Sequence, residues 1–180
     1  MWRPLKISVF DFDGTLFRSP YPPADWQGSW WGNTASLHPP IVPEIPGPDW
    51  WNQDVVERAK QAIADPDTVT ALVTGRLALK FTLRVQDLLS QVGLKFHHLE
   101  LCDGDDTLKF KMRVIDRLMK EYLSARGVNL WEDREEHLRQ YADHVESSGR
   151  AAFPHLVTVS PHEPGNVVSA ASVADRYLRK

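Results

Sequence analysis

Four short segments of the chain carry side chains that suit phosphoryl chemistry: carboxylates, hydroxyl groups, and ammonium or guanidinium groups. They are Asp11-Phe12-Asp13-Gly14-Thr15, Thr74-Gly75-Arg76, Lys109-Phe110-Lys111 and Glu132-Asp133. Each segment lies at the predicted end of a strand or beginning of a helix. Reactive groups in an open parallel sheet collect beyond the carboxyl ends of the strands. The sequence therefore predicts that the four segments form one site.

Each segment has a distinct use in that chemistry. Asp11 and Asp13 are two residues apart, so one carboxylate can attack phosphorus, forming an aspartyl-phosphate, while the other handles the proton of the leaving group. A carboxylate repels an anionic phosphate unless a cation lies between them, and Asp11 with Asp133 offers the hard oxygen ligands that Mg²⁺ prefers. Thr74 offers a hydroxyl group and a backbone amide to phosphate oxygens, and a lysine at a helix start can neutralise developing charge.

The order of the four segments, from Leu5 to about Asp133, resembles the motifs of the haloacid dehalogenase-like (HAD) phosphohydrolase superfamily. The resemblance implies that Asp11 is the nucleophile and Asp13 the general acid/base, which also gives its backbone carbonyl to Mg²⁺. It further implies that Thr74 binds phosphate and that Asp133 binds the metal. Superfamily members with aspartate at the position of Asp13 are typically phosphoesterases, so the resemblance favours hydrolysis of phosphate monoesters.

Two positions depart from the superfamily pattern. The fourth motif is usually an aspartate pair, but here it is Glu132-Asp133, so we assign the metal to Asp133 and a supporting role to Glu132. Lys109 and Lys111 are two residues apart on a predicted helix and project in different directions, so only one reaches the site easily. We favour Lys111 as the catalytic lysine and keep Lys109 as a candidate for substrate binding, because the run 107–111 resembles a narrower subgroup in which the later lysine recurs.

That subgroup is the HAD domain family called Swiss Army Knife RNA-repair-like. The segments that carry the resemblance cover most of the chain and are residues 11–20, a tryptophan-rich stretch, Phe96-His97-His98-Leu99 and Trp131-Glu132-Asp133-Arg134 followed by His137. The family name implies a role in processing damaged RNA ends. This resemblance and the aromatic insert make hydrolysis of a terminal phosphate on RNA or a nucleotide our leading hypothesis. A phosphatase of small metabolites and a binding module that keeps the fold without turnover remain open as alternatives.

Further polar residues near these segments are candidates for substrate binding. Gly75, Arg76 and Arg18 follow or adjoin the proposed site, although either arginine also suits an ordinary surface position. Arg134 and His137 lie just after the fourth segment and have the same two interpretations.

Helix-like and strand-like patterns alternate along the chain. The predicted strands are 5–10, 68–73, 96–101, 128–131 and 155–159, and the predicted helices are 52–63, 77–92, 108–124, 134–146 and, at the C-terminus, 167–178. On the second helix, Leu79 and Leu83 are expected to share an apolar face with Leu88 and Leu89. The alternation predicts a Rossmannoid three-layer α/β sandwich with a mainly parallel central sheet.

Residues 19–51 interrupt this alternation with eight of the 13 prolines and five of the seven tryptophans, so they cannot form regular helix. In the superfamily a substrate-selecting lid occupies this place. No lysine or arginine lies between Arg18 and Arg58, so a long phosphate backbone finds no charged partner here. The tryptophans can stack on a base or sugar, or they can simply pack the insert onto the core.

The whole chain suits a single HAD-like domain, residues 1–180, with 19–51 as its lid insert. Its 180 residues, 42% hydrophobic and 25% charged, are globular values, and no apolar run is long enough for a membrane span. The N-terminus enters a strand at once without the pattern of a signal peptide, and Cys102 is the lone cysteine, so we expect a cytoplasmic protein. The net charge of −3 neither favours nor excludes a nucleic-acid substrate, and no obligate protein partner is evident.

Overall fold

A parallel β-sheet lies at the centre of this computed structural model, which describes residues 2–163. Within those residues the sheet has five strands, β1 Lys6–Phe10, β2 Thr68–Leu77, β3 His98–Cys102, β4 Gly127–Glu132 and β5 Ala151–Leu156. They lie in the order β3-β2-β1-β4-β5, and each neighbouring pair is parallel. The carboxyl ends of the strands therefore meet at one edge, with β1 at its centre.

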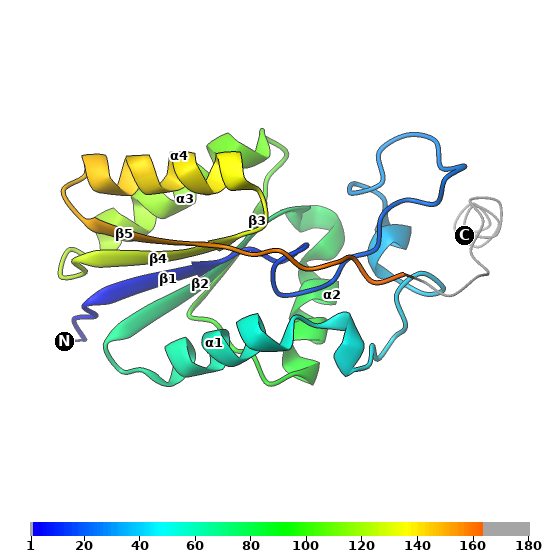
Figure 1. The fold of residues 1–180 in the computed structure, drawn as a ribbon, viewed down its shortest axis with the longest axis horizontal. Coiled ribbons are helices and arrows are strands. Elements are labelled where there is room, and N and C mark those ends of the chain that lie inside the picture. The colour runs from blue at the N-terminus through cyan, green and yellow to red at the C-terminus, as the bar shows by residue number, and fades with distance from the viewer. Residues whose placement is uncertain (1, 164–180) are drawn as a thin grey trace.

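Helices cover both faces of the sheet and give the fold three layers (Figure 1). The α-helices of the described residues are α1 Gln53–Ala64, α2 Ala78–Gln91, α3 Thr107–Glu121 and α4 Glu135–Ser147. α1 and α2 pack on one face and α3 and α4 on the other, and each pair buries its apolar side in a separate cluster. The predicted three-layer α/β fold is confirmed. None of the described helices has the length and apolarity that crossing a membrane requires.

The last strand lies earlier in the chain than the sequence predicts. The predicted range was 155–159, whereas β5 pairs residue by residue with β4 and ends where Leu156 meets Glu132, the last residue of that strand. β5 contains Pro154, which has no amide hydrogen, and such a residue is tolerated because β5 is an edge strand. The predicted helix 167–178 lies outside the described residues.

The prediction that Leu79 and Leu83 belong to the buried face of α2 is wrong. These two side chains are 98% and 83% exposed, respectively. The helix instead turns Phe81, Val85 and the stem of Arg84 inward, together with the two later leucines. Leucine spacing alone misplaces the face, because a buried arginine occupies a position that a hydrophobicity pattern assigns to solvent.

The 19–51 insert lies beside the carboxyl edge of the sheet and lacks α-helix, as its prolines predict. Its regular elements are two short 3₁₀ helices, η1 Thr34–Leu37 and η2 Pro48–Trp50. Arg84 of α2 fastens the insert to the core by donating hydrogen bonds to the carbonyl of Leu37 at 2.9 Å and that of Pro43 at 2.8 Å. Most insert tryptophans pack inward, and the buried ones are Trp30, Trp50 and Trp51.

Candidate active site

Asp11 lies at the centre of the carboxyl edge, directly after β1, and a lysine from α3 reaches it. Lys111 Nζ donates to Asp11 Oδ1 at 2.6 Å and to Glu132 Oε2 at 2.8 Å. All three side chains are buried. One ammonium group therefore holds two carboxylates together in a setting where an unpaired charge would be costly.

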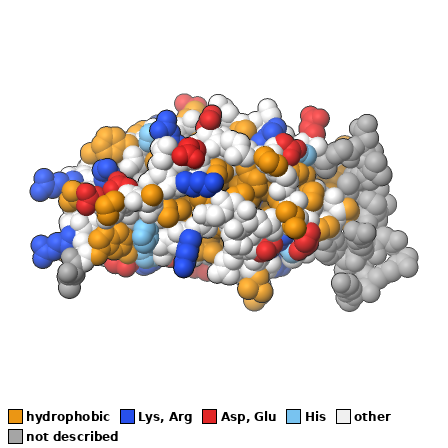
Figure 2. Space-filling model, turned by 90° about the horizontal axis from the view of Figure 1, so that it is seen from below, with side chains coloured by type: hydrophobic (Ala, Val, Ile, Leu, Met, Phe, Trp, Pro, Cys, Tyr) orange, Lys and Arg blue, Asp and Glu red, His pale blue; other side chains and the backbone are white. Residues whose placement is uncertain are grey.

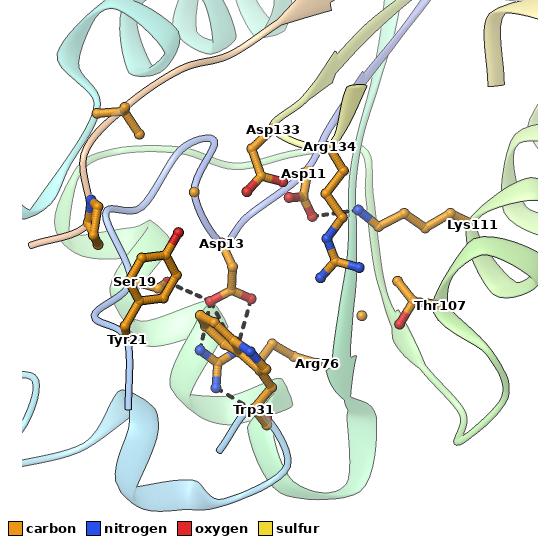
Figure 3. Close-up of a pocket in the computed structure, with 14 residues that line it drawn as sticks. Asp11, Asp13, Ser19, Tyr21, Trp31, Arg76, Thr107, Lys111, Asp133 and Arg134 are labelled. Carbon is orange, nitrogen blue, oxygen red and sulfur yellow. Dashed lines mark hydrogen bonds and ion pairs between the residues drawn. The ribbon is translucent and has the colours of Figure 1, made fainter. Parts of the chain in front are cut away.

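Asp133 brings a third carboxylate to the same place. Oxygen atoms of Asp11, Glu132 and Asp133 all lie within 4.8 Å of one another, and Figure 3 shows the side chains of Asp11 and Asp133 close together. Gly14 makes room for this arrangement: its φ is +71°, and a Cβ atom there would overlap the carboxylate of Asp133. The resulting oxygen-rich cluster has the donor chemistry that Mg²⁺ selects.

Burial and mutual repulsion raise the proton affinity of this cluster. Burial and the charge of Glu132 raise the pKa of Asp11 to about 7, although Lys111 opposes the shift. Burial, a hydrogen bond that protonated Asp133 donates to Glu132 and the charges of Asp11 and Glu132 raise the pKa of Asp133 to about 8. Burial alone would raise the pKa of Glu132 too, but the charge of Lys111 and the hydrogen bonds from Lys111, Asp133 and the backbone N–H of Arg134 together lower this pKa. Like-charged groups held this close favour a bound cation or a retained proton.

Asp13 points the other way, toward the insert, and is held by Arg76. The guanidinium donates from Nε to Asp13 Oδ2 at 2.9 Å and from Nη2 to Oδ1 at 2.7 Å, and Ser19 Oγ donates to Oδ1 at 2.5 Å. Burial would raise the pKa of Asp13, but the charge and hydrogen bonds of Arg76 lower it overall. Arg76 also donates to Ser36 Oγ and to the carbonyl of Trp31, so it joins Asp13 to the insert.

A cavity of about 450 Å³ opens in front of these carboxylates. Its walls come from the strand ends, the start of α3, the insert and the segment after β5, and Figure 3 shows the lining side chains. The lining residues are Asp11, Asp13, Gly14, Ser19, Tyr21, Trp31, Gly75, Arg76, Thr107, Lys111, Asp133, Arg134, Val159 and Pro161.

The model of HAD domain family 1 in Swiss Army Knife RNA repair proteins matches residues 22–170 of the chain. The chain belongs to this HAD family. The family model begins after Asp11 and Asp13, so the match rests on the remainder of the fold and includes the segments that carry Lys111 and Asp133. The resemblance read from the four motifs is thereby confirmed at the level of the family.

Solved structures with the same fold include a chain of an RNA repair complex and the HAD domain of an effector protein. The chain matches 43% of a chain in the Pnkp1/Rnl/Hen1 RNA repair complex, using 86% of its own length, with 16% identity and a TM-score of 0.52. It matches 95% of the HAD domain of the effector protein Lem4 from Legionella pneumophila, using 99% of its own length, with 10% identity and a TM-score of 0.52. At these identities the neighbours show the HAD fold alone.

A sequence relative is the uncharacterized protein YMR265C of Saccharomyces cerevisiae. The two sequences are 25% identical over an alignment of 158 residues, and the match covers 72% of this chain. The chain spans about a third of the length of that relative, 34%.

The structure of this HAD domain separates the two lysines that the sequence left as alternatives. Lys111 reaches Asp11, whereas the side chain of Lys109 is exposed on α3 and does not line the cavity. Arg18 also lies away from the cavity, because its guanidinium donates to the carbonyls of Ser160 and Asp49 at 2.9 and 2.8 Å. Neither side chain lines the cavity, and substrate binding by Lys109 and Arg18 stays a prediction.

The second motif is only partly open to the cavity. Gly75 and Arg76 line it, but Thr74 is fully buried and its Oγ1 accepts the backbone N–H of Arg76 at 3.2 Å. A Cβ atom on Gly75 would lie 2.8 Å from Thr107 Oγ1, so glycine is needed for the strand to approach α3. Phosphate binding by Thr74 stays a prediction from the resemblance.

Several lining residues escape sequence reasoning. Ser19 and Thr107 place hydroxyl groups at the cavity, and both stand inside segments that the family resemblance includes. Tyr21 and the pair Val159 and Pro161 come from irregular segments, where no periodicity indicates which side chain points inward. Ser19 and Thr107 could have been identified as site residues because they lie close in sequence to Asp13 and to Lys111, respectively.

Lys111→Met should lower kcat/KM by about 10²–10³-fold, the scale seen when one charge-stabilising donor is removed. The variant leaves Asp11 and Glu132 facing each other without their shared cation. Lys109→Met is the matched control, because it removes the same group two residues away from an exposed position, and it should retain nearly full activity. Steady-state hydrolysis of an aryl phosphate measures both, and equal losses in the two variants would refute the assignment of Lys111.

Mg²⁺ binding should tighten as the pH rises from about 6 to about 8. The raised pKa values of Asp11 and Asp133 mean that the metal-free cluster holds protons at the lower pH, and Mg²⁺ must displace them. The dissociation constant should fall by up to about tenfold per pH unit for each proton released. Titration calorimetry in buffers of different ionisation enthalpy measures both affinity and proton release. A dissociation constant that stays flat over this range would contradict the expectation.

Proposed function

We propose that this HAD domain is a Mg²⁺-dependent phosphomonoester hydrolase that works through an aspartyl-phosphate on Asp11. The observation that carries the proposal is the grouping of Asp11, Lys111 and Asp133 at one edge of the sheet, with Asp13 fixed beside them. A buried carboxylate flanked by a metal-binding cluster and an ammonium group suits attack on an anionic phosphate.

Asp11 and Asp13 divide the chemistry between them. A carboxylate oxygen of Asp11 attacks phosphorus, the bond from phosphorus to the leaving oxygen breaks, and Asp13 gives that oxygen a proton. A water molecule then attacks the phosphorus of the aspartyl-phosphate, Asp13 takes its proton, and the bond to Asp11 breaks to release inorganic phosphate. Arg76 keeps Asp13 ionised in the free protein, and an arriving phosphate dianion raises the proton affinity of Asp13, as its role as a donor requires.

The carboxylates of Asp11 and Asp133 and the backbone carbonyl of Asp13 would hold Mg²⁺. The carboxylate oxygens of Asp11, Glu132 and Asp133 lie close enough together to fit such an ion. Glu132 accepts a hydrogen bond from Lys111 and would help to hold the other two carboxylates in position. When bound, Mg²⁺ would neutralise charge between the nucleophile and the phosphate. Lys111, whose Nζ donates to Asp11 Oδ1, would stabilise the same negative charge with its ammonium group.

The substrate we favour is a terminal phosphate on RNA or a nucleotide. The family description and the RNA repair complex among the structural neighbours support this choice, and both describe other proteins. A small-metabolite phosphatase is the alternative reading of the same site. In this proposal residues 19–51 form the lid of a single domain spanning 1–180, and the free thiol of Cys102 is in keeping with work in the cytoplasm.

The test is hydrolysis of an aryl phosphate by the wild-type chain with Mg²⁺ and with a chelator. Turnover that depends on Mg²⁺, together with an increase in melting temperature when Mg²⁺ and a metallofluoride phosphate mimic are added, would support the proposal. Absence of turnover on aryl, nucleotide and sugar phosphates would favour the binding-module alternative. Metallofluoride contacts in a crystal soak would identify the groups that surround the transferred phosphoryl group.

A further inference from the structure

Asp13 determines where the leaving group of a phosphate ester must lie. A group that exchanges a proton with Asp13 has to come within roughly 2.6–3.2 Å of its carboxylate. That carboxylate faces the insert, where Arg76 holds it and packs with its guanidinium carbon 5.1 Å from the centroid of the Trp31 ring. Figure 3 shows Asp13 between the Asp11 cluster and the rings of Tyr21 and Trp31. The leaving group therefore meets the aromatic side of the cavity.

The rings of Tyr21 and Trp31, on that side of the cavity, are not buried in the core. Tyr21 is 67% exposed and Trp31 is 39% exposed, and the rings meet edge to face with centroids 6.5 Å apart. By contrast, Trp30, Trp50 and Trp51 are between 3% and 6% exposed. The packing role therefore belongs to those three, and the cavity role to Tyr21 and Trp31. Arg76 covers one face of Trp31, so a ligand ring would meet the other face.

Apolar side chains from the segment after β5 complete this wall. Val159 and Pro161 line the cavity. Arg18 holds their segment in place by donating from Nε to the carbonyl of Ser160 at 2.9 Å, while its own carbonyl accepts the amide of His162 at 2.8 Å. The wall is therefore preformed, which lowers the entropic cost of binding a flat group.

The charges of the cavity fit one phosphate group. The lining has three acidic residues and three basic ones, and Glu132 adds a fourth carboxylate behind Lys111, so one bound Mg²⁺ would leave a net charge of +1 to attract a single phosphate group. Arg76 and Lys111 are already bonded to carboxylates, and Arg134 is the remaining cation of the lining. On the face seen in Figure 2, which is the lower side of Figure 1 where α1 lies, lysine and arginine are scattered singly among other side chains, with no continuous basic strip for a phosphate backbone. About 450 Å³ is the size of a small-molecule site.

We propose that Tyr21, Trp31, Val159 and Pro161 form a subsite for the ring of a nucleoside, so that the substrate class is a nucleoside phosphomonoester, either free or at the end of an oligonucleotide. The base stacks on the aromatic rings, while the single phosphate lies at Asp11. This assignment rests on the proposed hydrolase function, because it places the leaving group relative to Asp13.

The test compares adenosine monophosphate with ribose 5-phosphate, which share the phosphate and sugar and differ in the base. In the wild-type chain kcat/KM should favour the nucleotide, and Trp31→Leu and Tyr21→Leu should each lower this preference by roughly 5- to 150-fold. Trp2→Leu is the control: Trp2 is 49% exposed, outside the cavity, and its loss should leave the preference intact. Circular dichroism and melting temperature verify that the variants fold.

A binding measurement separates failure of the subsite from failure of the proposed function. Quenching of tryptophan fluorescence by adenosine monophosphate in the Asp11→Asn chain with Mg²⁺ tests the subsite without turnover. Nucleotide preference that survives in both leucine variants, or an equal affinity for ribose 5-phosphate, would overturn the subsite alone. Tight, Trp31-dependent binding without wild-type hydrolysis of any ester would keep the subsite and overturn the hydrolase. An oligonucleotide with a terminal phosphate distinguishes the sources: its hydrolysis supports a strand end, and its rejection supports free nucleotides.

Discussion

Asp11→Asn should abolish the hydrolysis of every phosphomonoester that the wild-type chain accepts, with a loss on the order of 10⁴-fold or more, as expected when a nucleophile is removed. An amide oxygen is a poor nucleophile, and it also lacks the negative charge that a metal ligand supplies. The substitution nearly preserves the shape of Asp11 and leaves Lys111 paired with Glu132. The loss would therefore report chemistry rather than collapse of the site.

A melting temperature and a control variant distinguish loss of the nucleophile from loss of folding. The metal-free variant should melt no lower than the wild type above neutral pH, because the raised pKa of Asp11 shows that its charge is unfavourable in the folded site. Asp103→Asn is the control, since Asp103 is an exposed carboxylate paired with Arg113 and should keep full activity. A folded Asp11→Asn chain that retains activity within about tenfold of the wild type would refute the proposed nucleophile.

The sheet and the place of the site were predictable because both follow from short-range patterns. Apolar runs of strand length separated by helical stretches specify parallel strands joined by crossover helices. The carboxyl ends of such strands share an edge, so residues as distant as Asp11 and Asp133 are brought together by topology alone. The ordered motifs therefore predict which residues meet at this edge of the sheet.

The side-chain partners were not predictable from the same patterns. Lys109 and Lys111 are the same residue type, two positions apart in the sequence. Only the rotation of α3 about its own axis decides that Lys111 points toward the site. Arg84 on α2 is similar: its buried guanidinium bonds to carbonyls of a segment some 40 residues earlier, as the 47- and 41-residue separations of those bonds show. Long-range polar pairing of this kind leaves no periodic signal in the sequence.

The insert shows the same limit within a single residue type. The sequence does not distinguish its tryptophans from one another, and it leaves stacking on a ligand and packing on the core as alternatives. The structure divides them, with Trp31 at the cavity and Trp30, Trp50 and Trp51 in the core. Because proline-rich chain has no repeating geometry, the direction of each ring depends on tertiary contacts.

Arg76→Met should be the most destabilising single change outside the apolar core, and it should also lower activity. Arg76 is 2% exposed, and its guanidinium bonds to Asp13 and to two groups of the insert. Methionine fills much of the same volume but leaves the carboxylate of Asp13 without its cation. Breaking a buried ion pair from one side costs about 3–5 kcal/mol, and urea unfolding measured on metal-free protein would show it.

Arg113→Met and a double variant identify the cause of that loss. Arg113 pairs with two exposed carboxylates at the protein surface, so its removal should change stability little. If the unpaired charge of Asp13 is responsible, adding Asp13→Asn to Arg76→Met should restore part of the lost stability while activity stays low. A double variant no more stable than Arg76→Met would instead assign the loss to the bonds between Arg76 and the insert. Arg76 would then have two separate roles, orienting the carboxylate of Asp13 and fixing the insert. The position of the leaving group would depend on both contacts.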